Sequence, residues 1–211
     1  MGQLVDGQWQ DKDLPRSNRL GEFVRTNATF RETLGSQAYP AAPQRYHLFV
    51  NAGCPWAYRT ILYRSIKKLD AHVSLTFTQP SAGPQGWTFG EQPEPLLNTQ
   101  HIHEVYTTAD PRFTGRCTVP VLWDKQTRTI VNNESADIIR MFNTAFNKLP
   151  GVAPTDYYPA QLRDEIDSLN EEIYEHINNG VYRCGFAQTQ HAYEEAYDKL
   201  FTCLDRLDDR L

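Results

Sequence analysis

The chain has 211 residues, the size of one large domain or two small ones. Hydrophobic residues make up 40% of it and charged residues 22%, which favours a packed core over general disorder. Its net charge of −5 argues against a general nucleic-acid-binding protein. No apolar run approaches the ~20 residues of a membrane span, and the polar N-terminus lacks the apolar segment of a secretory signal. We therefore expect a cytoplasmic protein with no membrane or nucleic-acid partner.

Cysteine usage supports the same compartment. The four cysteines are Cys54, Cys117, Cys184 and Cys203. None belongs to a Cys-x-x-Cys pair, and none has a second cysteine or histidine at zinc-finger spacing. A disulfide scaffold is improbable at this length and cysteine density, so we expect reduced thiols.

The first clear pattern is β-α-β, and it follows an irregular N-terminal extension over residues 1–45. The run YHLFVN at 46–51 and the run VSLTFT at 73–78 predict strands. Between them, Cys54-Pro55 opens a predicted helix that continues to about Leu69, because proline suits the first helical position. The expected apolar face holds Ile61, Leu62, Ile66 and Leu69, and the expected outer face holds Arg59, Arg64, Lys67 and Lys68.

A long loop and then a β-β-α unit are predicted next. Residues 79–100 are rich in proline and glycine, and so long a connection indicates a functional loop. A short helix is expected near 102–109, strands at 119–124 and 129–132, and a helix from Asn133 onward. The order β-α-β, loop, β-β-α is typical of an α/β thioredoxin-like domain, which we place at residues 46–148.

Two amphipathic helices are predicted after a proline-containing linker at 144–159. The first stripe consists of Leu162, Ile166, Leu169, Ile173 and Ile177, and the second of Tyr193, Ala196, Leu200, Leu204, Leu207 and Leu211. We assign residues 149–211 to an all-helical domain. Two helices alone bury only part of these stripes, so Leu200, Leu204 and Leu207 are expected to be exposed.

Cys54 is the leading candidate nucleophile. A thiol at a helix N-terminus lies beside unpaired N–H groups and the positive end of the helix dipole, which favour the thiolate. Residue 57 is alanine, so the motif has no resolving cysteine and a monothiol cycle through an external thiol is the natural chemistry. The alternative is a buried, inert cysteine at a helix start.

Two further places suit a peptide-like ligand. Val119-Pro120 precedes a strand, and a cis proline there would present the Val119 backbone to an added strand; an ordinary trans proline is the alternative. Glu134-Ser135 opens a helix, where the Ser135 N–H and hydroxyl could bind a carboxylate and Glu134 an ammonium group. Plain helix capping explains the same residues.

The remaining polar residues and cysteines are weaker candidates for a functional site. His101 and His103 are two positions apart and would not share a helix face, so a metal site is improbable. Arg116 could hold a carboxylate or lie at the surface. Cys117, Cys184 and Cys203 have no ligand partners at useful spacing and are expected to be structural.

Several segments of the chain form a distinctive set. The most specific is Cys54-Pro55-Trp56-Ala57 with its flanks. Others are GWTF at 86–89, GRCTVPVLWD at 115–124, IVNNESADIIR at 130–140 and NNGVYRCGFA at 178–187. Together these segments resemble the glutathionyl-hydroquinone reductases, the Xi class of glutathione transferases, and the resemblance extends over nearly the whole chain.

This resemblance implies a thioredoxin-like domain followed by an all-helical domain, a homodimer, and glutathione-dependent reduction of glutathionyl-hydroquinones. It implies that Cys54 forms a mixed disulfide with glutathione and that Tyr182 lines the quinone side and helps deliver a proton. The implied glutathione contacts are Trp87, Arg116, the Val119 backbone, Glu134 and Ser135, with no metal.

Members of this family run beyond residue 211, so we expect an incomplete helical domain, a missing part of the hydroquinone site and little activity. Two alternatives remain. One is an Omega-like thiol transferase or dehydroascorbate reductase, which shares the monothiol chemistry. The other is a non-enzymatic glutathione-binding protein.

Overall fold

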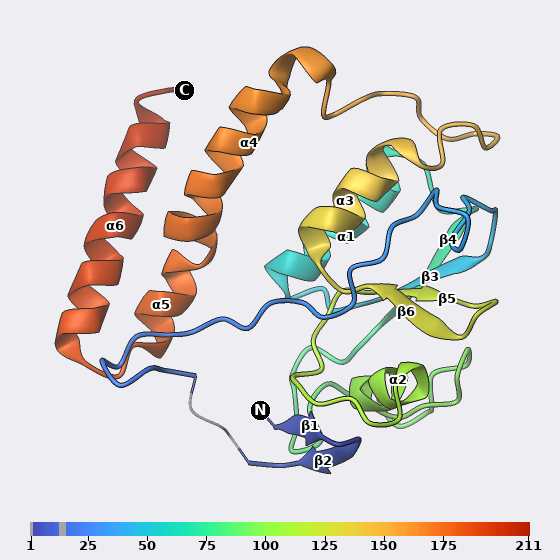
Figure 1. Cartoon of the computed structure of the whole chain (residues 1–211), viewed down its shortest axis with the longest axis horizontal. Helices are drawn as coiled ribbons and strands as arrows, with labels where there is room; N and C mark the ends of the chain where they lie inside the picture. The colour runs from blue at the N-terminus through green and yellow to red at the C-terminus, as the bar shows by residue number, and fades with distance from the viewer. Residues whose placement is uncertain (1, 13–15) are drawn as a thin grey trace. The chain divides into compact units, whose positions relative to one another are not determined.

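A computed structural model describes residues 2–12 and 16–211 of the chain (Figure 1). The chain divides into two compact units. The first comprises residues 1–13 and 28–157, and the second comprises residues 14–27 and 158–211. Each unit is described by itself.

A four-stranded mixed sheet forms the centre of the first unit. Its strands, in the order β4-β3-β5-β6, are Val73–Phe77, Tyr46–Val50, Val121–Asp124 and Thr129–Asn132. Strands β3 and β4 are parallel, whereas β5 is antiparallel to both of its neighbours. Every residue of β3 and β5 is buried, as expected for central strands covered on both faces.

Helices cover both faces of this sheet. Figure 1 shows α1 (Pro55–Ile66) and α3 (Ser135–Thr144) on one face and α2 (Ile102–Ala109) on the other. Aromatic side chains fill much of the core between them; those fully buried include Tyr46, Phe49, Tyr106, Trp123, Phe142 and Phe146. The predicted thioredoxin-like order of elements is confirmed.

The N-terminal extension is more regular than expected, because it begins with a β-hairpin. Strands β1 (Gln3–Val5) and β2 (Gln8–Gln10) pair antiparallel around the turn Asp6-Gly7. Both turn residues have positive φ, 47° and 74°. An Asp-Gly pair is a strong hairpin signal for this reason, so the prediction of an irregular start overlooked a pattern that the sequence contains.

Two predictions for the first helix were wrong. Lys67, expected at the surface, is fully buried, and its ammonium group donates a 2.7 Å hydrogen bond to the Thr155 carbonyl. Burial lowers the pKa of Lys67. Leu62, expected in the core, is 49% exposed, because the helix turns Ala57 and Thr60 toward the sheet instead.

The second unit holds a long interrupted helix and one regular helix. The 3₁₀ turn η1 (Ala160–Leu162) leads into α4 (Arg163–Glu172), then a π-helical turn η2 (Ile173–Asn178), then α5 (Gly180–Phe186). Helix α6 (Gln190–Asp208) begins at Thr189, whose hydroxyl accepts a hydrogen bond from the Ala192 N–H. The two predicted helices are therefore present, with a π turn that periodicity did not reveal.

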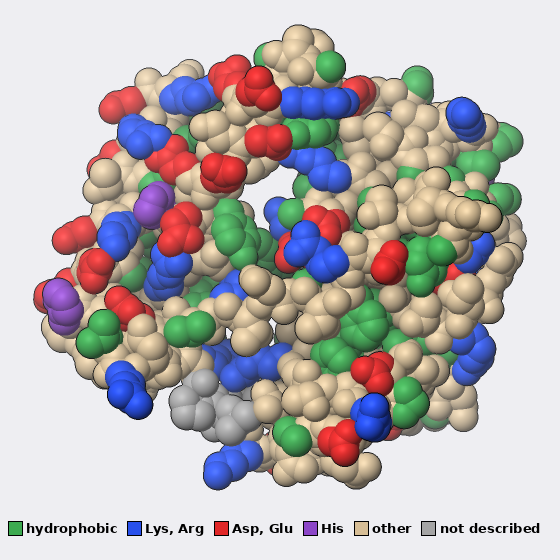
Figure 2. Space-filling view, viewed as in Figure 1, with side chains coloured by type: hydrophobic (Ala, Val, Ile, Leu, Met, Phe, Trp, Pro, Cys, Tyr) green, Lys and Arg blue, Asp and Glu red, His purple; other side chains and the backbone are tan. Residues whose placement is uncertain are grey.

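The apolar face of α6 is less exposed than expected. Leu200 is only 7% exposed and packs beside Gly180, so the prediction of an exposed Leu200 was wrong. Leu204 is exposed at 37% as predicted. Charged side chains of both signs are interspersed over the helices of this unit (Figure 2) and form ion pairs such as Arg183–Glu175 and Lys199–Glu195. In the described part of the chain, no helix is both long and apolar enough to cross a membrane.

Candidate active site

Cys54 lies where the first central strand meets the first helix. It is the N-cap residue of α1, with extended backbone angles, and its carbonyl accepts the first helical hydrogen bond from the Tyr58 N–H at 2.8 Å. Its side chain is half-buried. The thiol therefore lies at the N-terminal end of α1, where the helix dipole favours a thiolate.

Asn51 fixes the turn that presents Cys54, and sequence patterns did not single it out. Its side-chain carbonyl accepts a 2.8 Å bond from the Gly53 N–H, and its backbone carbonyl accepts from the Cys54 N–H at 3.2 Å. Its amide donates to the Thr78 hydroxyl and the Gln79 carbonyl at 2.9 and 2.7 Å. Asn51 is fully buried, so these bonds hold the turn rigidly between two strand ends.

Val119 is the predicted ligand residue that lies against the candidate nucleophile. The Cys54 Sγ is 3.8 Å from the Val119 carbonyl oxygen and donates to it. The Val119–Pro120 peptide bond is cis, as the first of the two alternatives predicted. Cys54 and the Val119 backbone, 65 residues apart in sequence, thus form one site.

The segment that carries Arg116 and Val119 is held at two points. Gly115 exchanges two 3.0 Å backbone hydrogen bonds with Leu4 of β1. Three residues further on, Thr118 bonds to the hydroxyl of Tyr106. Arg116 lies between these anchors and is half-buried. The β1–β2 hairpin therefore supports the segment that carries Arg116 and Val119.

Trp87 belongs to the long loop that was expected to be functional. It is half-buried and packs against the core of the first unit. Its carbonyl accepts a 2.9 Å bond from the Ile102 N–H at the start of α2. The loop is consequently anchored to a helix close to Trp87.

Glu134 and Ser135 lie side by side at the start of α3, and both contact Arg59. Glu134 is the N-cap residue, and its carboxylate accepts from the Ala136 N–H at 3.0 Å. Ser135 is buried, with 3% of its surface exposed. Arg59 donates to the Ser135 hydroxyl oxygen from Nε at 3.0 Å and from Nη2 at 2.7 Å, and Nη2 is 3.5 Å from Glu134 Oε1. Arg59 was expected at the surface, and its partner Ser135 is 76 positions away in the sequence, too far for a local pattern to reveal it.

The other three cysteines lie in settings that disfavour a thiolate. Burial raises the pKa of Cys117 to about 12. Burial also raises the pKa of Cys184 and, together with the nearby Glu172 carboxylate, that of Cys203. The prediction that these cysteines are structural agrees with their surroundings, because the thiol form is the weak nucleophile.

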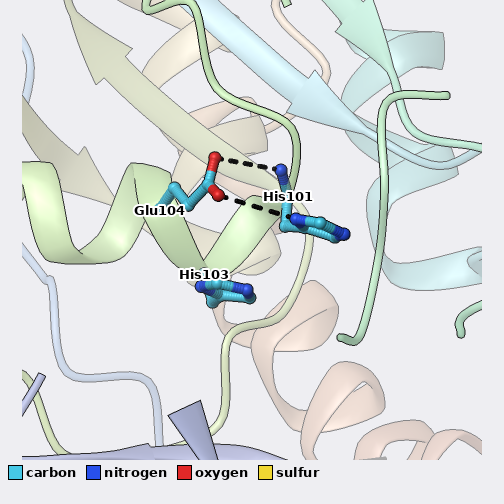
Figure 3. A group of neighbouring side chains, drawn as sticks. All are labelled: His101, His103 and Glu104. Carbon is cyan, nitrogen blue, oxygen red and sulfur yellow. Dashed lines mark hydrogen bonds and ion pairs between the residues drawn. The ribbon is translucent and has the colours of Figure 1, made fainter. Parts of the chain in front are cut away.

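His101 and His103 lie closer together than predicted (Figure 3). His101 is the N-cap of α2 rather than a helical residue, so its ring stacks on that of His103 with centroids 5.2 Å apart and planes 8° apart. In-plane lone pairs of nearly parallel rings do not converge on one ion. The nearby Glu104 carboxylate accepts backbone bonds from Gln100 and His101, at 2.6 and 3.3 Å. Stacking and helix capping therefore account for this group of metal-ligand residue types.

Tyr182 belongs to the second unit. It lies on α5, its ring stacks on Phe23 and Phe186, and the Arg25 guanidinium lies 4.5 Å from its ring centroid. Arg25 also donates a 2.6 Å bond to the Asn179 side chain. A cavity of about 490 Å³ in this unit is lined by Phe23, Arg25 and Asn179, together with residues of η2, α5 and α6.

A thioredoxin-like sheet with a cysteine at the start of its first helix is compatible with the glutathione transferase class, although the arrangement is not unique to it. In agreement, residues 53–145 match the family model described as "Glutathione S-transferase, N-terminal domain".

The full-length comparisons are more specific. The chain is 45% identical to glutathionyl-hydroquinone reductase PcpF of Sphingobium chlorophenolicum, over all of this chain and 68% of that protein. The glutathione-bound structure of YqjG from Escherichia coli K-12 is 42% identical, with a TM-score of 0.86 over 99% of this chain and 66% of that one. The Xi glutathione transferase of Phanerochaete chrysosporium is 45% identical, with a TM-score of 0.86 over 90% of this chain and 63% of that one.

The chain belongs to the glutathionyl-hydroquinone reductase family, the Xi class of glutathione transferases. It spans about two thirds of the length of these relatives.

Proposed function

We propose that this protein reduces glutathionyl-hydroquinones to hydroquinones, with glutathione as co-substrate and Cys54 as nucleophile. The observation that carries the proposal is the position of the Cys54 thiol, at the N-terminus of α1 and 3.8 Å from the Val119 carbonyl. Membership of a family whose relatives are named glutathionyl-hydroquinone reductases supplies the substrate class.

The proposed reaction has two steps. The Cys54 thiolate attacks the thioether sulfur of the glutathionyl-hydroquinone, the bond from sulfur to the aromatic carbon breaks, and that carbon keeps the electron pair and takes a proton. This step leaves Cys54 in a mixed disulfide with glutathione. The thiolate of a second glutathione then attacks the glutathionyl sulfur, which releases oxidised glutathione and restores the Cys54 thiolate. Overall, one glutathione thiol and the thioether sulfur of the substrate are oxidised to the disulfide of oxidised glutathione, and the aromatic carbon is reduced.

The remaining residues have binding roles in this proposal. The Val119 backbone pairs with the cysteinyl unit of glutathione in the manner of an added strand. Glu134 takes the γ-glutamyl ammonium group, and Ser135 takes the neighbouring carboxylate at the N-terminus of α3. Trp87 and Arg116 contact the rest of glutathione. Tyr182 lines the quinone side of the site and helps deliver the proton that the aromatic carbon takes. A homodimer and a cytoplasmic location complete the proposal and rest on the family resemblance and the reduced cysteines.

Intact-mass spectrometry after incubation with a glutathionyl-hydroquinone tests this function. We expect one glutathione adduct on the wild type, release of hydroquinone, and loss of both in Cys54→Ser. Cys184→Ser is the matched control, since it removes another half-exposed thiol and should keep the adduct.

The outcomes separate the alternatives. An adduct that survives Cys54→Ser would refute the assignment of the nucleophile. Turnover of dehydroascorbate without attack on the thioether would indicate the Omega-like thiol transferase. Glutathione binding without any adduct would indicate a binding protein.

A further inference from the structure

Arg59 joins the two helices that frame the candidate site. It lies on α1 five residues after Cys54, which is about 7.5 Å along the helix axis. Its guanidinium packs over the Trp56 ring, 5.2 Å from the ring centroid, and reaches the first residues of α3. One helix therefore carries the nucleophile at its start and contacts the γ-glutamyl subsite with a side chain further along.

The two Arg59 bonds determine how the Ser135 hydroxyl can act. A hydroxyl has one donor hydrogen and two acceptor lone pairs. Nε and Nη2 of Arg59 both donate to the Ser135 oxygen, at 3.0 and 2.7 Å, so both lone pairs are engaged. The hydroxyl hydrogen points to Glu134 Oε1 over a long 3.4 Å contact. Ser135 is thereby prepared to donate a hydrogen bond to a carboxylate rather than to accept one.

Charge acts in the same direction. The Arg59 guanidinium lies 3.5 Å from Glu134 Oε1. Its positive charge offsets the repulsion that the Glu134 carboxylate would exert on an incoming carboxylate. Hydrogen bonds to ionised groups contribute more than those between neutral groups, so this arrangement favours an anionic ligand end.

We propose that Arg59 is a positioning and specificity-determining residue for glutathione, which selects the α-carboxylate of the γ-glutamyl unit by holding Ser135 as a hydrogen-bond donor. The inference rests on the proposed binding of glutathione at Glu134 and Ser135 and adds a third residue to that subsite. Arg59 acts through Ser135, so removing its guanidinium should affect the carboxylate contact and leave the rest of the ligand's binding in place.

Calorimetric titration in the Cys54→Ser background tests this role, because that background binds without disulfide exchange. The two ligands are glutathione and γ-aminobutyryl-cysteinyl-glycine, which lacks the α-carboxylate and keeps the amine. We expect Arg59→Met to weaken glutathione binding about tenfold or more and analogue binding less than about twofold. Arg59→Lys should restore part of the glutathione affinity, since it restores the charge but not the two-pronged contact.

A double-mutant cycle identifies the route of the effect. Arg59→Met combined with Ser135→Ala should weaken glutathione binding no more than the stronger single change, because both remove the same contact. The matched control is Arg64→Met, which removes a guanidinium of the same helix whose bonds go to the Val73 carbonyl and to Asp70. It should leave both affinities unchanged.

The failures are distinguishable. Equal losses for the two ligands, or additive losses in the double variant, would overturn the role of Arg59 while leaving glutathione binding intact. A parent protein that binds neither ligand would overturn the proposed function itself. Thermal unfolding of each variant shows whether it still folds. In a folded variant, the ratio of the glutathione affinity to the analogue affinity measures the loss of specificity.

Discussion

The Tyr106 hydroxyl donates a 2.9 Å hydrogen bond to the Thr118 carbonyl and accepts one from the Thr118 N–H at 3.3 Å. It also accepts a 3.0 Å bond from the Asn133 amide. Thr118 directly precedes Val119, and Asn133 directly precedes Glu134. Burial raises the pKa of Tyr106 to about 12, so the hydroxyl keeps its proton throughout the physiological range. One phenol on α2 thus connects the two segments proposed to bind glutathione.

Tyr106→Phe should therefore lower both stability and ligand affinity. It leaves the Thr118 and Asn133 groups without their buried partner, which costs about 1–3 kcal/mol in free energy of unfolding. All four tryptophans lie in the first unit, so urea unfolding followed by tryptophan fluorescence reports on that unit. Tyr46→Phe is the matched control, because its buried hydroxyl donates to Pro40 at 2.8 Å. We expect Tyr46→Phe to lose a similar amount of stability and to bind glutathione as the wild type does. If Tyr106→Phe binds glutathione as well as Tyr46→Phe, the connecting role of Tyr106 is refuted.

The four thiols should differ in reactivity. Limited alkylation with iodoacetamide near pH 7.5 should label Cys54 first, because it is half-buried at a helix N-terminus. Cys117 should react last, since burial raises its pKa to about 12, and raised pKa values should also slow Cys184 and Cys203. Peptide mapping at short reaction times measures the order. All four should react alike in urea, whereas native Cys184 labelling as fast as Cys54 would contradict the assignment.

Much of this arrangement could be predicted from local sequence patterns. Three of these features depend only on neighbours within a few residues: the alternating strands, the helix start at Cys54-Pro55 and the helix start at Glu134-Ser135. The structure contains all three. The bonds of Arg59 to Ser135 and of Lys67 to Thr155 could not be predicted, because their partners are 76 and 88 residues away. A charged residue on a helix is usually solvated, so the expectation of a surface position was reasonable and still wrong for Lys67. The Asp6-Gly7 hairpin differs, because its signal was local and was overlooked.

His47 should make stability depend on pH. It is buried in β3, and desolvation, together with the positive charges of Lys125 and Arg64, lowers its pKa from 6.5 to about 4. Below pH 6.5 the unfolded chain binds a proton that the folded chain does not. The contribution of His47 to stability is therefore fully present above pH 6.5 and is lost between pH 6.5 and about 4, by up to about 3 kcal/mol.

Replacing His47 tests the predicted direction of this pH dependence of stability. His47→Asn retains a polar group opposite the Ser74 hydroxyl, which lies 2.7 Å from His47 Nδ1. We expect the difference in unfolding free energy between wild type and variant to shrink as the pH falls from 7 to 4, because only the wild type loses the His47 contribution. A difference that stays constant over this range would exclude His47 as the titrating group. Comparison of the two proteins at each pH cancels the contribution of the shared carboxylates.

Arg45 and Asp124 form the ion pair whose loss should be most costly. Arg45 Nε and Nη2 donate to the two carboxylate oxygens of Asp124 at 2.9 and 2.5 Å, and the side chains are 8% and 0% exposed. The Thr127 hydroxyl donates a further 2.7 Å bond. Burial alone would raise the pKa of Asp124, but these hydrogen bonds outweigh it and the pKa is lowered.

Asp124→Asn should cost about 3–5 kcal/mol, because it leaves the Arg45 charge buried without its counter-ion. Urea unfolding followed by tryptophan fluorescence measures this loss. The control is Glu195→Gln, which breaks the exposed Lys199–Glu195 pair and should leave stability measured by helical circular dichroism nearly unchanged. Arg45→Met combined with Asp124→Leu should be more stable than Asp124→Asn, since the double variant buries no unpaired charge. If the double variant is the less stable of the two, the attraction within the Arg45–Asp124 pair exceeds the cost of desolvating both groups. The stability lost in Asp124→Asn would then be the loss of that attraction rather than the cost of an unpaired buried charge.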